Sequence, residues 1–167
     1  HHEVDRLACE VPPRYRTLVY VLAYGGLRWG EAAALRRYRL DLDRNRLEIA
    51  ESLAEIGSRL VFGPTKTSRD RTIAIPQFLT ELIEQHLSEF VEPGRTSLVF
   101  TATNGAPLRN SNFAKNVWKP AVRRAALPAD LRIHDLRHTA AALMIRESAH
   151  PEAIKRHLGH SSITVTM

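Results

Sequence analysis

Cysteine is almost missing from this sequence of 167 residues, which holds only Cys9. A single cysteine cannot form an internal disulfide, and it excludes a zinc site built from several thiolates. It is also typical of a reducing compartment. We therefore expect the protein to act in the cytoplasm.

Long apolar runs are missing as well. No stretch approaches the roughly 20 apolar residues that a membrane-spanning helix needs, and the first residues do not resemble a signal peptide. The sequence also has no internal repeat and no low-complexity tract. We expect one folded domain with no membrane partner.

Positive charge is what the sequence has in excess. Lys and Arg number 24 against 18 Asp and Glu, which gives a net charge of +6. The apolar fraction of 44% and the length are those of one ordinary folded domain, so disorder does not explain the charge. This balance favours a polyanionic partner, with nucleic acid first.

The spacing of apolar residues predicts an α+β domain that is mainly α. Segments 40–51, 58–62 and 71–75 favour strands and predict a small three-stranded antiparallel sheet, and residues 97–100 could add a short strand. Helical spacing or helix-end signals occur over residues 14–24, 28–36, 78–90, 112–127, 135–146 and 151–158.

Particular residues mark the expected ends and bends of these helices. Gly25 and Gly26 stop the first helix, and Ser111 is a candidate N-cap for residues 112–127, where Pro120 should cause a kink. Pro151 suits a first helical position and Gly159 a helix end. Ser161 or Ser162 could begin one more helix.

A dense polar cluster stands directly before an apolar helical run, in the stretch "IHDLRHTAAALM". His134 and Arg137 lie three apart, on neighbouring positions at the start of one helix. Positive charge there opposes the helix dipole unless an anion is bound, and the planar fork of arginine matches phosphate. The alternative is an internal salt bridge between Arg137 and Asp135 or Glu31.

Other cations occupy exposed corners of the predicted fold. Arg28 lies at a glycine-bounded helix corner, where the backbone can approach a ligand closely. Lys66 lies in the turn "GPTKTSRDR", which we expect to close a hairpin, and His160 directly follows Gly159.

Three motifs in this order resemble the catalytic domain of the tyrosine recombinases, the phage integrase family. They are Gly-Leu-Arg-x-Gly-Glu at 26–31, His-x-Leu-Arg-His at 134–138 and Leu-Gly-His at 158–160. The resemblance spans nearly the whole chain. It implies the fold of that domain and an enzyme for site-specific DNA recombination, such as phage or prophage integration and excision. Cleavage would pass through a 3′-phosphotyrosyl intermediate.

The resemblance also implies roles for individual residues. Arg28 and Arg137 match the two arginines that clamp the phosphate, and fixed guanidiniums would stabilise charge on its oxygens. His134 and His160 match two further positions that contact the phosphate or handle protons, and Lys66 matches the lysine that protonates the departing 5′ oxygen. The remaining family positions are supports: Glu31, His138 and, as an N-cap or partner of a nearby histidine, Asp135. No cofactor is implied.

The nucleophile does not match. The four tyrosines are Tyr15, Tyr20, Tyr24 and Tyr38, and none follows His160, where the family places its nucleophile. We therefore expect residues 1–167 to be a single catalytic domain that stops before that tyrosine and lacks the separate N-terminal DNA-gripping domain. Such a chain should not cleave DNA by itself. Ser148 is a smaller departure, because the family often has glycine there.

The expected partner is double-stranded DNA, which would bring the protein to the nucleoid. Contacts to the phosphate backbone would position the duplex. One candidate set repeats every four residues on one predicted helix, although a solvated helix face is the alternative: Lys115, Lys119, Arg123. A second candidate set follows the first arginine motif: Arg36, Arg37, Arg39. The resemblance further implies a homotetramer on DNA and a possible accessory directionality factor.

Two other functions compete with recombination. His134 and His138 have a spacing that can bind zinc, and His157 and His160 could complete the site of a zinc-dependent hydrolase. Arg137 would repel a dication there, so we expect no bound metal. A non-catalytic DNA-binding module would share the basic charge without requiring the whole set of motif residues.

Overall fold

The computed structural model describes residues 2–159, and its fold is built around helix α2 (Arg16–Tyr20). A 3₁₀ turn at Pro13–Tyr15 leads into α2, which continues as a π-helical turn over Val21–Gly25. Four apolar side chains of α2 and its π-helical turn are almost fully buried: Leu18, Val19, Val21, Leu22. Residues 14–24 therefore form the expected helix, and it lies at the centre of the core.

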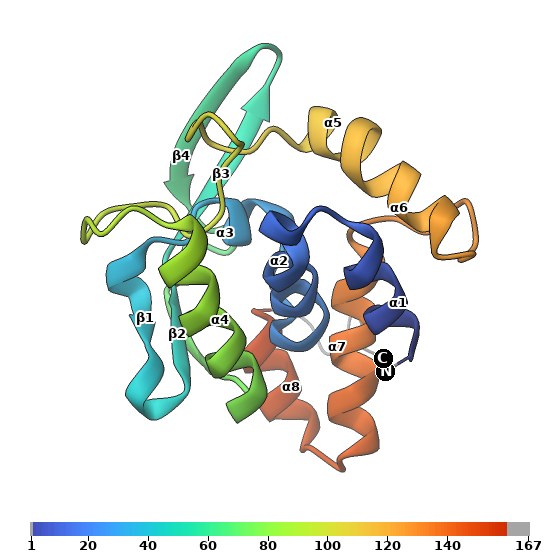
Figure 1. The fold of residues 1–167 in the computed structure, drawn as a ribbon. Coiled ribbons are helices and arrows are strands. Elements are labelled where there is room, and N and C mark those ends of the chain that lie inside the picture. The colour runs from blue at the N-terminus through green and yellow to red at the C-terminus, as the bar shows by residue number, and fades with distance from the viewer. Residues whose placement is uncertain (1, 160–167) are drawn as a thin grey trace.

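Three helices surround this central helix, as Figure 1 shows: α1 (His2–Glu10), α4 (Gln77–Phe90) and α7 (Asp135–Arg146). The π-helical turn packs against α7, and the short α3 (Trp29–Ala33) follows after the corner at Gly26. The chain thus places the start of α3 beside the start of α7.

The sheet region is divided in two. Strands β2 (Arg46–Ile49) and β3 (Glu51–Ile56) form one long segment with a break at Ala50. β2 pairs with β1 (Leu40–Asp41) and β5 (Arg71–Ala74) in an antiparallel sheet of order β1-β2-β5, and β3 pairs only with β4 (Arg59–Pro64). The β3–β4 ribbon projects away from the helical body (Figure 1).

This division confirms a three-stranded antiparallel sheet but corrects its membership. Residues 58–62 were expected in that sheet, yet β4 pairs with β3 in a separate ribbon. Leu60 and Phe62 of β4 pack on Leu53 and on the end of α3, in a small cluster apart from the main core. The expectation that Lys66 lies at a hairpin tip is therefore wrong, because segment 65–70 links two sheets.

The helix expected over residues 112–127 also differs from expectation at its start. The helix comprises α5 (Asn110–Phe113), a π-helical turn at Ala114–Trp118 and α6 (Lys119–Arg124). The residue at the N-cap is Arg109, so the assignment of Ser111 as N-cap is wrong. The Ser111 hydroxyl instead donates to Glu55 in β3. The irregularity expected at Pro120 lies in the π-helical turn directly before it.

The last described helix ends as the sequence predicts. Helix α8 (Pro151–Leu158) begins with Pro151, and Gly159 ends it with a φ of 70°. Segment 97–100 contributes a single bridge from Leu98 to Arg36 instead of a strand. The helix that Ser161 or Ser162 was expected to begin lies outside the described residues. Within residues 2–159, no helix has the length and apolar character needed to cross a membrane.

Candidate functional site

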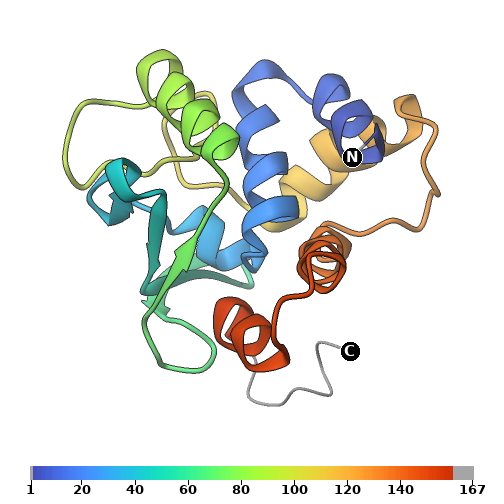
Figure 2. The same cartoon turned by 90° about the horizontal axis from the view of Figure 1, so that it is seen from below.

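A basic hollow lies where segment 65–70 meets helix α8, and Figure 2 shows the two side by side. Its volume is about 920 Å³. The cations that line it outnumber its two acidic residues, Asp70 and Glu152, and come from three parts of the chain: Arg28, Lys66, Arg69, Arg71, Lys155, Arg156. Such a surface attracts an anion.

Arg28 reaches this hollow from the corner between the central helix and α3. The corner depends on Gly26, whose φ is +72° and where an added Cβ would lie 2.6 Å from Leu158 Cδ2. Arg28 itself is extended, and its side chain is 22% exposed. Its Nη1 is buried and has no hydrogen-bond partner among the described residues. An ion-pair partner, the Glu31 carboxylate, lies 3.7 Å from this nitrogen, which is too far for a hydrogen bond.

Glu31 lies behind Arg28, with its side chain completely buried. Its carboxylate accepts hydrogen bonds from the backbone N–H of Arg28 at 2.8 Å and from both Nη atoms of Arg71 at 2.7 and 2.9 Å. Burial alone would raise the pKa of Glu31, but the hydrogen bonds and charge of Arg71, followed by those of Arg28, lower it below its usual value. Glu31 is therefore a buried anion.

Arg137, in the first turn of α7, is 3% exposed and does not line the hollow. Its Nη1 donates to the Gly26 carbonyl at 2.5 Å, and its Nη2 donates to the Leu158 carbonyl. Burial, together with the nearby charge of Arg28, lowers the pKa of Arg137 to about 9, which leaves it charged at neutral pH. In the described chain Arg137 has no ion pair with Asp135 or Glu31, so the salt-bridge alternative is not supported.

Asp135 has a different partner from those expected. Its carboxylate accepts the backbone N–H of Arg132 at 2.7 Å and pairs with the Arg132 guanidinium at 3.0 Å. The N-cap residue of α7 is His134. Asp135 is therefore neither the N-cap nor a hydrogen-bond partner of a described histidine, and it closes the turn before α7.

The two histidines of the second motif lie together on the exposed side of this cluster. The rings of His134 and His138 meet edge to face, with centroids 5.3 Å apart. Partial burial lowers the pKa of His134, as do the charges of His138, Arg137, Arg132 and Arg28. His134 lies at the N-cap of α7, three residues before Arg137. His160, the remaining predicted site residue, lies outside the described residues.

Lys66 is exposed at the mouth of the hollow. The segment that carries it is held at its base by Thr65, which is 2% exposed and whose hydroxyl donates to the Arg69 carbonyl at 3.0 Å. Ser68 has a φ of 55°, so the loop turns sharply back toward β5. Lys66 is therefore an exposed amine on a loop whose base is held by a hydrogen bond.

Arg71 was not predicted as a site residue, although a signal was present. Along β5, Ile73 is buried while Thr72 and Ala74 are exposed. Because side chains alternate along a strand, Arg71 lies on the same face as Ile73 and points inward. A charged residue on the apolar face of a predicted strand needs a buried partner, which here is Glu31.

The two outer sets of cations differ in whether their side chains already have partners within the described residues. Arg36 donates to the Thr96 carbonyl, Arg37 to the Glu92 carbonyl, and Arg39 pairs with Glu48 at 2.6 Å. Lys115, Lys119 and Arg123 are exposed on the α5–α6 helix and form no ion pair within residues 2–159. The second set is the freer of the two.

The zinc alternative lacks a ligand cluster in the described residues. No three His, Cys, Asp or Glu side chains gather there in an arrangement that could hold a metal ion. His157 is 2.8 Å from the Gly25 carbonyl through its Nε2, so that nitrogen is a hydrogen-bond donor. The nitrogen is thus committed to the backbone.

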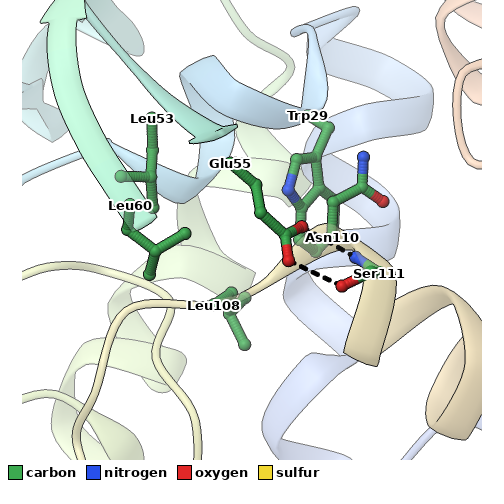
Figure 3. Close-up of a pocket in the computed structure, with 7 residues that line it drawn as sticks. All are labelled: Trp29, Leu53, Glu55, Leu60, Leu108, Asn110 and Ser111. Atoms are coloured by element: carbon green, nitrogen blue, oxygen red, sulfur yellow. Dashed lines mark hydrogen bonds between the residues drawn. The ribbon is translucent and has the colours of Figure 1, made fainter. Parts of the chain in front are cut away.

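A second hollow, of about 430 Å³, lies between the β3–β4 ribbon and the start of α5 (Figure 3). Glu55 points into it and accepts hydrogen bonds from the backbone N–H and the hydroxyl of Ser111, at 3.1 and 2.6 Å. These bonds hold the pKa of Glu55 below its usual value. The carboxylate caps a helix start from a neighbouring strand, which is a structural role.

Comparison of the fold defines the class of protein. An integrase of the transposon Tn1549, in complex with a circular intermediate DNA, superimposes with a TM-score of 0.81 at 21% identity over 92% of this chain and 53% of that one. The catalytic domain of bacteriophage HP1 integrase gives a TM-score of 0.67 at 23% identity over 99% of this chain and 81% of that one. The fold is that of tyrosine recombinase catalytic domains.

The sequence defines the family. The chain belongs to the phage integrase family, because it matches the model of that family over residues 1–167. The integrase of Mycobacterium phage D29 is 33% identical over 170 residues, which cover 99% of this chain and 45% of the relative. Tyrosine recombinase XerA of Thermococcus kodakarensis is 28% identical over 98% of this chain and 54% of the relative. The chain spans about half the length of these curated relatives.

Proposed function

We propose that the natural protein recombines DNA at specific sites, as in integration or excision of a phage or prophage genome. In this reaction a tyrosine oxygen attacks the phosphorus of one strand, and the bond to the 5′ oxygen breaks. The resulting 3′-phosphotyrosyl bond is later attacked by another 5′ hydroxyl, which rejoins the strand. We propose that the tyrosine lies beyond residue 167, because the family places it after His160 and none of the four tyrosines, Tyr15, Tyr20, Tyr24 and Tyr38, follows that residue.

One observation carries this proposal. Arg28 Nη1 has no hydrogen-bond partner in the described chain, and Arg137 is hydrogen-bonded to Gly26 in the corner that carries Arg28. His134 lies three residues before Arg137, at the start of α7. Two motifs that lie more than 100 positions apart in the sequence are thus joined at this corner, which supports the proposal. A phosphate bound there would accept hydrogen bonds from groups that are already oriented, so charge developing on its oxygens would need no reorganisation.

The other predicted residues receive roles on the same basis. We assign Lys66 to protonation of the departing 5′ oxygen, since it is an exposed amine at the mouth of the hollow. His134 and His160 would contact the phosphate or handle protons. Glu31 and His138 would support the arginines and the start of α7.

Duplex DNA is the proposed partner. The Tn1549 integrase, a structural neighbour of this chain, is described in complex with DNA. We assign backbone contacts to the exposed set Lys115, Lys119 and Arg123, and secondary contacts to Arg36, Arg37 and Arg39. A homotetramer on DNA, a directionality factor and action at the nucleoid in the cytoplasm belong to the same proposal.

The experiment uses the longest natural form of the protein and a nicked duplex that releases a short 5′ fragment after cleavage. Because release of the fragment prevents rejoining, the covalent adduct accumulates and survives denaturant. We expect such an adduct, with the protein on the 3′ side of the break. DNA binding without any adduct on cognate DNA would favour the non-catalytic DNA-binding module.

The role of Lys66 has its own test. Lys66→Ala should slow cleavage of an ordinary 5′-oxygen leaving group, because no proton donor remains. A 5′-thio leaving group departs without protonation and should restore the rate. An equal defect with both leaving groups would contradict the assignment.

A further inference from the structure

Three guanidiniums surround one buried carboxylate in this site. Arg71 occupies both oxygens of Glu31, while Arg28 contributes its backbone N–H and keeps its Nη1 at 3.7 Å from the carboxylate. Arg137 donates hydrogen bonds to backbone carbonyls and forms no ion pair with Glu31, although the charge of Glu31 raises the pKa of Arg137. The division of partners therefore leaves the Arg28 guanidinium only loosely held.

This division depends on Arg71. Its side chain is 10% exposed and that of Glu31 is fully buried, so the pair is formed in a region of low dielectric. A buried carboxylate that loses its partner must find another cation or take up a proton. The nearest available cation is Arg28, which belongs to the same helix corner.

Arg71 also contacts the end of α8. Its Nε donates to the His157 carbonyl at 2.9 Å. Its guanidinium lies over Gly159, where an added Cβ would be 3.0 Å from Nη1 and 3.1 Å from Cζ. One side chain from β5 therefore joins the carboxylate of α3 to the turn that follows α8.

From these contacts we infer that Arg71 is a positioning residue for the phosphate clamp: by neutralising Glu31 it leaves the Arg28 guanidinium free for the DNA phosphate. This inference rests on the proposed recombination function. It adds a residue that lies outside all three motifs and that acts through Glu31 on Arg28. Because the proposed role depends on the charge of Arg71, a variant that removes the charge but keeps the size of the side chain can test it.

The test compares single-turnover adduct formation and DNA affinity for variants of the longest natural form of the protein. Arg71→Gln keeps the size and some hydrogen bonds but removes the charge, so Glu31 should draw Arg28 away from the phosphate. We expect cleavage to fall about 30-fold or more, with DNA affinity nearly unchanged. Arg71→Lys retains a charge beside Glu31 and should stay within about 5-fold of the original rate.

The decisive variant combines Arg71→Gln with Glu31→Gln. This pair removes the anion together with its partner, so nothing remains to capture Arg28, and we expect cleavage to recover about 10-fold over Arg71→Gln alone. A purely structural role for Arg71 predicts that cleavage recovers only as far as the free energy of unfolding does, because the double variant also removes an unpaired buried carboxylate. Recovery of cleavage beyond that of stability supports the inference, whereas recovery limited to that of stability, or no recovery, would overturn it. Arg44→Gln removes the same charge from a side chain that is 82% exposed, and it should leave cleavage unchanged.

Two further outcomes are distinguishable. If the unaltered protein forms no adduct on cognate DNA, the proposed function fails, whatever Arg71 does. If the unaltered protein cleaves and Arg71→Gln cleaves equally well, only the inference about Arg71 fails. Should Arg71→Gln not fold, the double variant and Arg71→Lys still decide the question, because the inference requires both to cleave.

Discussion

Arg137 Nη1 donates to the carbonyl oxygen of Gly26 at 2.5 Å, across 111 positions of sequence. This bond joins the first turn of α7 to the corner that precedes Arg28. Arg137 therefore holds the corner in place, and we propose that it also contributes charge to the phosphate clamp. Variants at the corner itself can test the structural function without altering a charge.

Gly26→Ala is expected to destabilise the protein. The backbone there has a φ of +72°, and the new Cβ would lie 2.6 Å from Leu158 Cδ2 and 3.1 Å from Ala140 Cβ. Backbone strain and overlap together should lower the free energy of unfolding by roughly 2–4 kcal/mol, measured by urea denaturation. Gly63→Ala is the matched control, because nothing lies within 4 Å of its Cβ position. Equal stability of the two variants would contradict this account of the corner.

Ser148→Gly is expected to stabilise the protein. Ser148 follows α7 with a φ of 59°, a region that glycine occupies without steric cost. The gain in unfolding free energy should be about 0.5–1 kcal/mol. Ala142→Gly, inside α7, should instead lower stability by about 1 kcal/mol. A loss of stability in Ser148→Gly would show that its side chain contributes more than its backbone strain costs.

The stability of the protein should decrease as the pH falls from 7 to 5. Burial lowers the pKa of His86, against the weaker effect of its hydrogen bond to the Val99 carbonyl, and Nδ1 of His86 is buried without a partner in the described chain. The unfolded chain then binds more protons below its ordinary histidine pKa, so stability is full above that pKa and is lost as the pH falls. The pKa values of His134 and His157 are also lowered, so they act in the same direction.

His86→Gln tests this assignment. Glutamine can still donate to the Val99 carbonyl but does not titrate, so urea denaturation at pH 5, 6 and 7 should give a shallower pH dependence than in the unaltered protein. An unchanged slope would place the titration elsewhere.

Affinity for duplex DNA should decrease steeply as the salt concentration rises. Replacing Lys115, Lys119 and Arg123 together by Gln should weaken binding to cognate and unrelated duplexes alike, because phosphate contacts carry no sequence information. If each cation neutralises one phosphate, the slope of log affinity against log salt should lose about 0.9 per contact. An unchanged slope would leave these side chains as a solvated helix face.

Local signals in the sequence predicted much of this fold. Helical spacing around Leu18 and Leu22, Pro151 at the start of α8 and the left-handed Gly159 at its end all depend on neighbouring residues. The pairing of strands, in contrast, depends on residues that are far apart in the sequence. Because β3 and β4 form their own ribbon, the meander predicted for residues 40–75 was only partly right.

Candidate site residues could be predicted where a motif contains them, and less so where distant residues meet. Arg28, His134 and Arg137 are predicted from two short motifs. Arg71 was missed because its partner Glu31 is 40 positions away, and only the inward face of β5 indicated it. The Ser111 hydroxyl was assigned to its own helix, although it bonds Glu55 in a strand 56 positions earlier.

The central claim is that Arg28 acts through its charge on the phosphate of the cleaved strand. Cleavage rates of the longest natural form and its Arg28→Ala variant should be compared on a normal duplex and on one with a neutral methylphosphonate at the cleaved position. On the normal duplex we expect a defect of about 100-fold or more, by analogy with a lost oxyanion donor. On the neutral duplex the defect should shrink to a few-fold, because little charge remains to be stabilised. A defect of the same size on both duplexes would contradict the claim.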